Sequence, residues 1–249
     1  MEAFFLFCKS CKPLFNERIH LDLVLLSFAA AFFIGPKQRM SVLNITSVDD
    51  MFKILAAKGR PLSSFKKGDT IKVWNKMEKG YSYVLSENPG TGLAFEPYLT
   101  PGEILALGAF GGKYLNDCLL EFPAEWFWDA GLLGKLCPGG ENIDVNYFKI
   151  DSRLPLGEWK KAGWVPGGKK LSGKREVLSL RNPDERGWFQ WYCRYWMGRR
   201  IKELDEVQIQ RWKNFVRHYG AVKKACKPGD LSCRPRQRQA LLHWAWKFD

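Results

Sequence analysis

Arginine and lysine are concentrated in the last quarter of the chain, where they could neutralise phosphate groups. From residue 186 to residue 249 there are fifteen Lys and Arg against five Asp and Glu. Arginine suits phosphate because its planar guanidinium donates paired hydrogen bonds, and each neutralised phosphate releases counterions. Nine residues are therefore predicted to bind a polyanion: Arg199, Arg200, Arg211, Arg217, Lys223, Lys224, Arg234, Arg236 and Arg238.

The last three of these arginines give the strongest single indication of a binding site. Pro235 fits the first turn of a final helix, so Arg234, Arg236 and Arg238 lie at its start. Cations at a helix N-terminus oppose the helix dipole, and such a cluster is easier to explain if it meets an anion. A second basic stretch, residues 166–175, is predicted to be either a solvated insert or a loop that binds a nucleic-acid backbone.

Acidic residues offer a different chemistry. Glu121, Glu125 and Asp129 are four residues apart and would share one face of a helix. Such a row could hold Mg²⁺ or act in acid/base chemistry, or it could be solvated or paired with Lys and Arg. The chain has no nucleophile elbow, HExxH, Rossmann or Walker motif, so we assign no catalytic residue and expect no metal and no cofactor.

The seven cysteines are odd in number and irregularly spaced. This pattern argues against a secreted disulfide scaffold and favours a reducing, intracellular compartment, with the cytoplasm expected first. Cys226 and Cys233 are close enough to form a local bridge or half of a metal site. His218 and His243 would complete a Cys₂His₂ set, although the spacings match no usual zinc finger.

The segment 184–200 must position much of this chemistry, because it is the most aromatic part of the chain. At helical spacing its aromatic residues form two adjacent stripes, which leave little for water beyond Gln190 and Arg194. A helix that is apolar nearly all round is buried, so we expect the central helix of the core here. The alternative is that these rings stack on unpaired bases.

Local patterns around this segment predict a mainly α (α+β) fold, a compact helical domain with one small β-hairpin near its N-terminal side. Ser47 and Thr100 begin capping-box patterns, and the latter helix should stop at the glycine pair 111–112. Residues 203–225 read as one long amphipathic helix. Residues 70–75 and 80–85 alternate in the manner of two strands around a polar turn.

Residues 1–39 differ from the rest and are predicted to be an extension, a leader or a targeting segment. Their apolar run, residues 21–35, is short for a bilayer-spanning helix, which needs about 20 residues. A membrane is an expected partner only if that run is a genuine membrane segment. Residues 40–249 are predicted to form a single basic domain, whether translation begins at Met1 or at Met40.

The run GWFQWYCRY at residues 187–195, followed by GRR at 198–200, resembles the signature of a family of uncharacterised proteins from bacteria, algae and fungi. Further matching pieces lie at 99–103, 110–114, 121–123 and 236–244. The resemblance covers roughly residue 81 to the C-terminus. It implies one compact unit and supplies no catalytic residue.

The net charge of +13 and a pI near 9.4 favour anionic partners. We therefore expect a nucleic-acid-binding protein that contacts phosphates through its C-terminal surface with weak sequence preference. One alternative is an enzyme that acts on nucleic acid or another polyanion through the acidic residues. Another is a structural subunit whose basic face docks on an acidic protein or a larger assembly.

Overall fold

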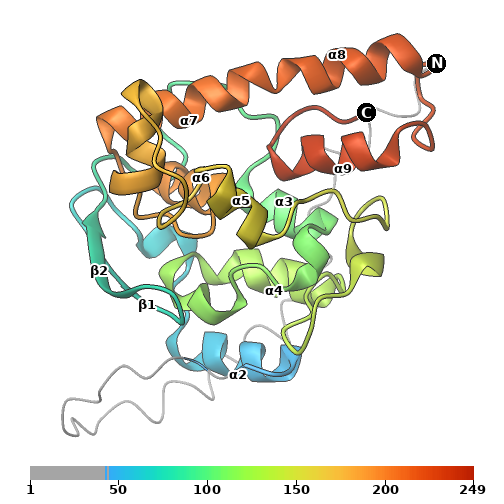
Figure 1. Ribbon diagram of the computed structural model, residues 1–249. Helices are drawn as coiled ribbons and strands as arrows, with labels where there is room; N and C mark the ends of the chain where they lie inside the picture. The colour runs from blue at the N-terminus through green and yellow to red at the C-terminus, as the bar shows by residue number, and fades with distance from the viewer. Residues whose placement is uncertain (1–42, 44) are drawn as a thin grey trace, which may run out of the picture. The chain divides into compact units, whose positions relative to one another are not determined.

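The computed structural model describes residues 43 and 45–249, which lie within one compact unit, residues 40–249 (Figure 1). The extension predicted at residues 1–39 and its apolar run fall outside the described residues. Among the helices that are described, none combines the length and the apolar character needed to cross a bilayer.

The described unit is mainly helical and has one two-stranded antiparallel sheet, as the sequence predicts. The α-helices are α2 (Val48–Lys58), α3 (Pro101–Leu107), α4 (Ala124–Leu132), α5 (Leu156–Lys161), α6 (Trp188–Trp196), α7 (Lys202–Asn214), α8 (Val216–Ala225) and α9 (Pro235–His243). The strands are β1 (Thr70–Trp74) and β2 (Lys79–Val84). Short 3₁₀ segments connect the helices, and a π-helical turn, η7 (Val177–Arg181), precedes α6.

Both predicted capping boxes are formed. The Ser47 hydroxyl accepts a hydrogen bond from the Asp50 amide at 3.1 Å, and the Thr100 hydroxyl accepts one from the Glu103 amide at 3.3 Å. The second helix ends earlier than predicted, at Gly108, whose φ of 100° stops it. A Cβ at Gly108 would lie 2.0 Å from the Val145 carbonyl oxygen, so only glycine fits this crossing.

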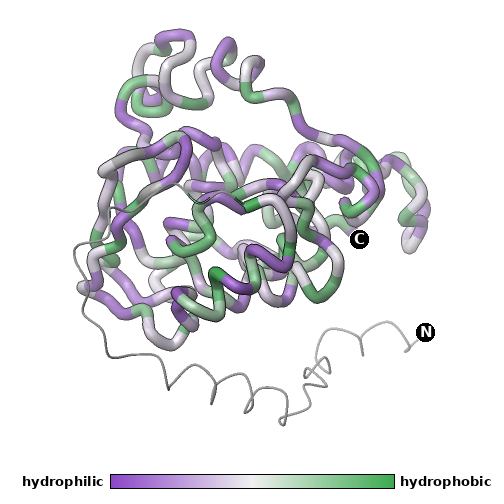
Figure 2. The backbone as a smooth tube through the Cα atoms, turned by 90° about the horizontal axis from the view of Figure 1, so that it is seen from below, coloured by the Kyte–Doolittle hydropathy of each residue, from purple (hydrophilic) through white to green (hydrophobic). Residues whose placement is uncertain are grey.

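Helix α6 is the centre of the core, and all nine of its residues are buried. Its aromatic rings pack on Phe95, with centroid distances of 6.0 Å to Trp191 and 5.8 Å to Tyr195. Along the described chain, hydrophilic and hydrophobic segments alternate over short distances (Figure 2). This is the pattern of elements that bury one face and expose the other.

The prediction that Gln190 and Arg194 face water is wrong, because both side chains are fully buried. Arg194 bonds three carboxylates, with closest distances of 2.6 Å to Glu121, 2.8 Å to Glu78 and 2.8 Å to Asp184. Although burial opposes the charge, Glu121 and Asp184 raise the pKa of Arg194 above its ordinary value. Paired in this way, the arginine is stable inside the core.

The helix predicted over residues 203–225 is in fact two helices, α7 and α8, which meet at Phe215. They follow one another along one edge of the unit in Figure 1, and α9 packs beside α8. Phe215 stacks on Trp244 of the segment after α9, with ring centroids 4.5 Å apart. The junction of α7 and α8 is thus in contact with the segment that follows α9.

Candidate functional site

The nine cations predicted to bind a polyanion occupy three different environments. Arg199 and Arg238 are buried, with only 2% of each exposed, and Arg200 and Arg211 are half-buried. The remaining five are exposed, and we call them the exposed cation set: Arg217, Lys223, Lys224, Arg234 and Arg236.

The prediction that Arg199 contacts phosphate is wrong. Its guanidinium donates two hydrogen bonds to the buried Asp184 carboxylate, at 2.8 and 2.6 Å. A third bond, at 3.2 Å, goes to the Tyr81 hydroxyl. Arg199 therefore belongs to the same buried network as Arg194.

The prediction for Arg238 is also wrong. Its guanidinium donates to the backbone carbonyls of Cys233 at 2.8 Å, Asp230 at 2.9 Å and Phe248. The side chain thus holds the C-terminal tail against the loop before α9. Arg200 is largely occupied too, because it donates to four backbone carbonyls and stacks on Tyr195 at 4.1 Å.

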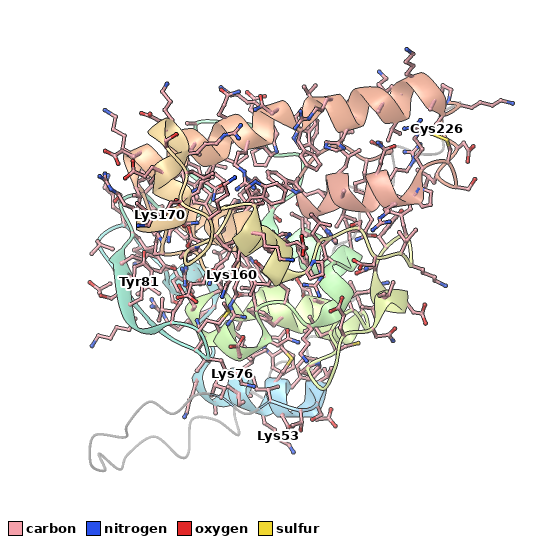
Figure 3. The ribbon with its side chains drawn as sticks, viewed as in Figure 1. Lys53, Lys76, Tyr81, Lys160, Lys170 and Cys226 are labelled. Atoms are coloured by element: carbon pink, nitrogen blue, oxygen red, sulfur yellow. A yellow bond between two sulfur atoms is a disulfide. The ribbon has the colours of Figure 1, made fainter. Side chains whose placement is uncertain are left out.

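The exposed cation set lies on α8 and at the start of α9. A disulfide between Cys226 and Cys233 joins the end of α8 to the residue before Arg234 (Figure 3). Of the two roles predicted for these cysteines, a local bridge or half of a metal site, the structure shows the bridge. Within residues 43 and 45–249, no carboxylate lies within ion-pair distance of any member of the set. These charges are available to an external anion.

One member of the set, Arg217, also lines a cavity of about 420 Å³, which we call the aromatic pocket. Its described lining contains four arginines and no Asp or Glu. The lining residues are Phe110, Ser152, Arg153, Leu154, Trp159, Trp164, Val165, Arg175, Leu178, Gly187, Trp188, Phe189, Arg211, Asn214, Phe215, Arg217, His218, Ala240, His243 and Trp244. Two predicted phosphate-binding residues, Arg211 and Arg217, therefore come together here.

Four rings of the lining stack on one another in a continuous column. Centroid distances are 4.7 Å from Trp188 to Trp244, 4.5 Å from Trp244 to Phe215, and 4.3 Å from Phe215 to His218. The column begins on the buried first turn of α6 and ends at the half-buried His218. It forms a rigid wall that extends from the core to the surface.

Another part of the pocket lining comes from residues 159–175, which include the end of α5, Trp164 and the basic stretch 166–175. Trp164 remains 37% exposed, and the Arg175 side chain is exposed. The stretch is held to α5 by a hydrogen bond from the Lys169 amide to the Lys160 carbonyl, at 2.9 Å. Figure 3 marks Lys160 and Lys170 on this side of the unit, where both are exposed and add positive charge.

Arg211 is the cation that the pocket environment affects most. Its guanidinium lies 5.2 Å from the Trp244 ring centre and 5.7 Å from the Trp164 ring centre, and it donates to the Gln208 side chain at 2.7 Å. Burial, and secondarily the charge of Arg175, lowers the pKa of Arg211 to about 10. The residue stays protonated at neutral pH, so a bound anion would relieve an uncompensated charge.

His243, at the inner end of the pocket, is neutral. Its Nε2 accepts a hydrogen bond from the Phe110 amide at 3.2 Å, and its Nδ1 lies 3.2 Å from the Ser152 hydroxyl. Burial, followed by the nearby charge of Arg153, lowers the pKa of His243 to about 3. The imidazole therefore serves as a fixed packing and hydrogen-bonding group.

The acidic row predicted on one helical face is only partly formed, because Glu125 and Asp129 lie on α4 but Glu121 does not. Glu121 precedes α4, lies in a 3₁₀ segment and binds Arg194, while Glu125 accepts the Leu62 amide at 3.0 Å. Asp129 is the remaining member, and burial, followed by the charge of Glu125, raises its pKa. In the described part of the chain, no three His, Cys, Asp or Glu side chains converge as metal ligands would.

The sequence patterns did not indicate several residues of this pocket. Trp159, Trp164 and Arg153 were not selected, and Arg175 appeared only as one cation of the basic stretch. The available signal was the pair of tryptophans just before a cationic, glycine-rich segment. Comparisons with protein-family models, curated proteins and solved structures gave no match to this chain, so the site rests on its own geometry.

Proposed function

We propose that this protein binds nucleic acid through phosphate contacts made by the exposed cation set and by the arginines of the aromatic pocket. The observation that supports this most is the pocket lining, in which four arginines and several aromatic rings occur without a carboxylate. Nucleic acid presents both kinds of group that such a surface binds, phosphates and flat aromatic bases.

The alternatives account for less of the surface. A subunit that docks on an acidic protein would use the exposed cations but would not require a hollow lined by tryptophan. An enzyme working through the acidic row would need Glu121 free, whereas Arg194 occupies it. Weak sequence preference follows from the predominance of phosphate contacts, which carry no base information.

The test is the salt dependence of binding to a fluorescein-labelled oligonucleotide, measured by anisotropy on the full chain. One variant combines Lys223→Gln, Lys224→Gln, Arg234→Gln and Arg236→Gln. Each lost phosphate contact on a single strand makes the slope of log Kobs against log salt shallower by about 0.7, so the four together should reduce it by about 3.

A matched control removes the same charge from another face through Lys53→Gln, Lys58→Gln, Lys66→Gln and Lys72→Gln. These lysines are exposed, and Figure 3 shows Lys53 on α2, far from Cys226 at the end of α8. The proposal expects the control to keep most of the wild-type slope. Equal losses in the two variants would mean that net charge alone, and no particular surface, drives binding.

A further inference from the structure

Resting on the proposed function, we propose that the aromatic pocket receives one unpaired nucleobase of a single strand, with the phosphate of that nucleotide bound by Arg175, Arg211 and Arg217. The chain would then prefer single-stranded nucleic acid to duplex. The proposal thus gives the cavity a ligand, an unpaired nucleotide, and a binding mode, base stacking. Neither follows from phosphate contacts alone.

The size and the walls of the cavity support a base as its occupant. Its volume of about 420 Å³ lies within the range of small-molecule pockets, about 300–1,000 Å³. The Trp188, Trp244 and Phe215 rings already stack on one another and form a fixed wall. Trp164, which is 37% exposed, still has ring surface that a base could cover.

The charges around the cavity support a phosphate beside the base. Among the described residues, Arg175, Arg211 and Arg217 have no carboxylate within ion-pair distance, whereas Arg153 is neutralised by Glu141. The first turn of α6 also lines the cavity, and no side chain forms a capping hydrogen bond at this helix N-terminus. The positive end of its dipole therefore adds to the attraction of an anion.

The uncharged polar groups of the lining are mostly occupied within the protein. The Ser152 hydroxyl lies 3.2 Å from His243 Nδ1, and the Asn214 side-chain oxygen accepts from Gln210 at 3.0 Å. Few groups are left to read the hydrogen-bonding edge of a base. The pocket should therefore accept different bases, as sites that bind by stacking do.

A base within a duplex cannot enter the pocket, because stacking covers both of its faces and leaving the stack costs energy. Truncation of a tryptophan that stacks on a base weakens single-strand binding by about 10-fold or more. We therefore expect Trp164→Ala to weaken binding of a single-stranded oligonucleotide by about 10-fold and to leave binding of the duplex of the same sequence unchanged. The same anisotropy measurement tests both ligands.

Two further variants complete the design. Trp128→Ala is the matched tryptophan control, because Trp128 is half-buried and lies on α4 against Phe52, outside the pocket lining. Arg175→Gln changes an exposed side chain that forms no ion pair within the described residues, so it tests the pocket even if Trp164→Ala fails to fold. Adenosine 5′-monophosphate should compete with the single strand more strongly than adenosine or inorganic phosphate does.

The outcomes separate the two proposals. If single strand and duplex bind equally, and neither Trp164→Ala nor Arg175→Gln lowers the preference for single strand, the pocket does not hold a base, although phosphate binding stands. If neither nucleic acid binds, the proposed function itself fails. Loss of single-strand binding in Trp164→Ala, with Trp128→Ala unchanged, supports the inference.

Discussion

The guanidinium of Arg194 and the carboxylate of Asp184 lie 2.8 Å apart, and neither side chain has any exposed surface. Asp184 also pairs with Arg199 at 2.6 Å, so this one carboxylate forms ion pairs with two arginines. Although burial opposes ionisation, the two arginines lower the pKa of Asp184 below its ordinary value. The network joins α6 to the hairpin and to the segment before α4 through fully buried charges.

Removal of the central arginine should therefore destabilise the protein strongly. Arg194→Met leaves Glu78, Glu121 and Asp184 buried without that cation, and breaking a buried pair in this way costs about 3–5 kcal/mol. The free energy of unfolding, obtained from urea titration followed by circular dichroism, measures the loss. Arg181→Met is the control, since its pair with Glu203 is exposed and should contribute less than about 1 kcal/mol.

Local patterns predicted the elements of the fold well, because capping boxes, strand alternation and aromatic stripes depend on neighbouring residues. The environment of Arg194 could not be predicted in this way. Its partners Glu78 and Glu121 lie 116 and 73 residues away along the chain. The sequence pattern also assigned Arg199 and Arg238 to a surface, whereas both are buried. Arg199 binds Asp184, 15 residues away, and Arg238 binds backbone carbonyls 5, 8 and 10 residues away.

The aromatic pocket was hidden from the sequence for a related reason. Its lining comes from α5, α6, α7, α8, α9, the segments between them, and also Phe110 and residues 152–154, so no single stretch contains it. The junction of α7 and α8 at Phe215 was not predicted either, because the pattern over residues 203–225 is that of one continuous helix. Neither proline nor glycine marks that break in the sequence.

Arg238 provides a prediction that separates structural from binding roles. Arg238→Gln should lower the free energy of unfolding by about 2 kcal/mol, because charged hydrogen bonds to three partly buried backbone carbonyls are lost. It should leave the salt slope of nucleic-acid binding unchanged. A shallower slope in this variant, with stability intact, would restore Arg238 to the set of phosphate contacts.

His243 should make stability depend on pH. The folded state keeps this histidine neutral down to a pKa of about 3, whereas the unfolded chain takes up a proton below its ordinary pKa of 6.5. Its contribution is therefore present above pH 6.5 and is lost as the pH falls, by about 1.4 kcal/mol per pH unit.

Denaturant titrations of wild type and His243→Gln between about pH 6 and about pH 4 measure this contribution. The difference in unfolding free energy between the two proteins should shrink with falling pH, since glutamine cannot be protonated. A difference that stays constant over this interval would mean that His243 titrates alike in both states.

The Cys226–Cys233 disulfide should stabilise the connection between α8 and α9. The two residues are separated by seven positions, and closing so short a loop stabilises by about 2 kcal/mol. A reducing agent should lower the unfolding free energy of wild type by this amount. The reducing agent should have no effect on the unfolding free energy of the Cys226→Ser/Cys233→Ser double variant. If it destabilises both proteins equally, the lost stability comes from other cysteines.

The most direct measurement of the central claim is the affinity of the wild-type chain for a single-stranded oligonucleotide at about 50 and about 200 mM salt. If the exposed cation set and the pocket arginines bind phosphates, affinity should fall on the order of a thousandfold between the two conditions. Absence of binding at the lower salt concentration, or an affinity that does not change with salt, would contradict the account.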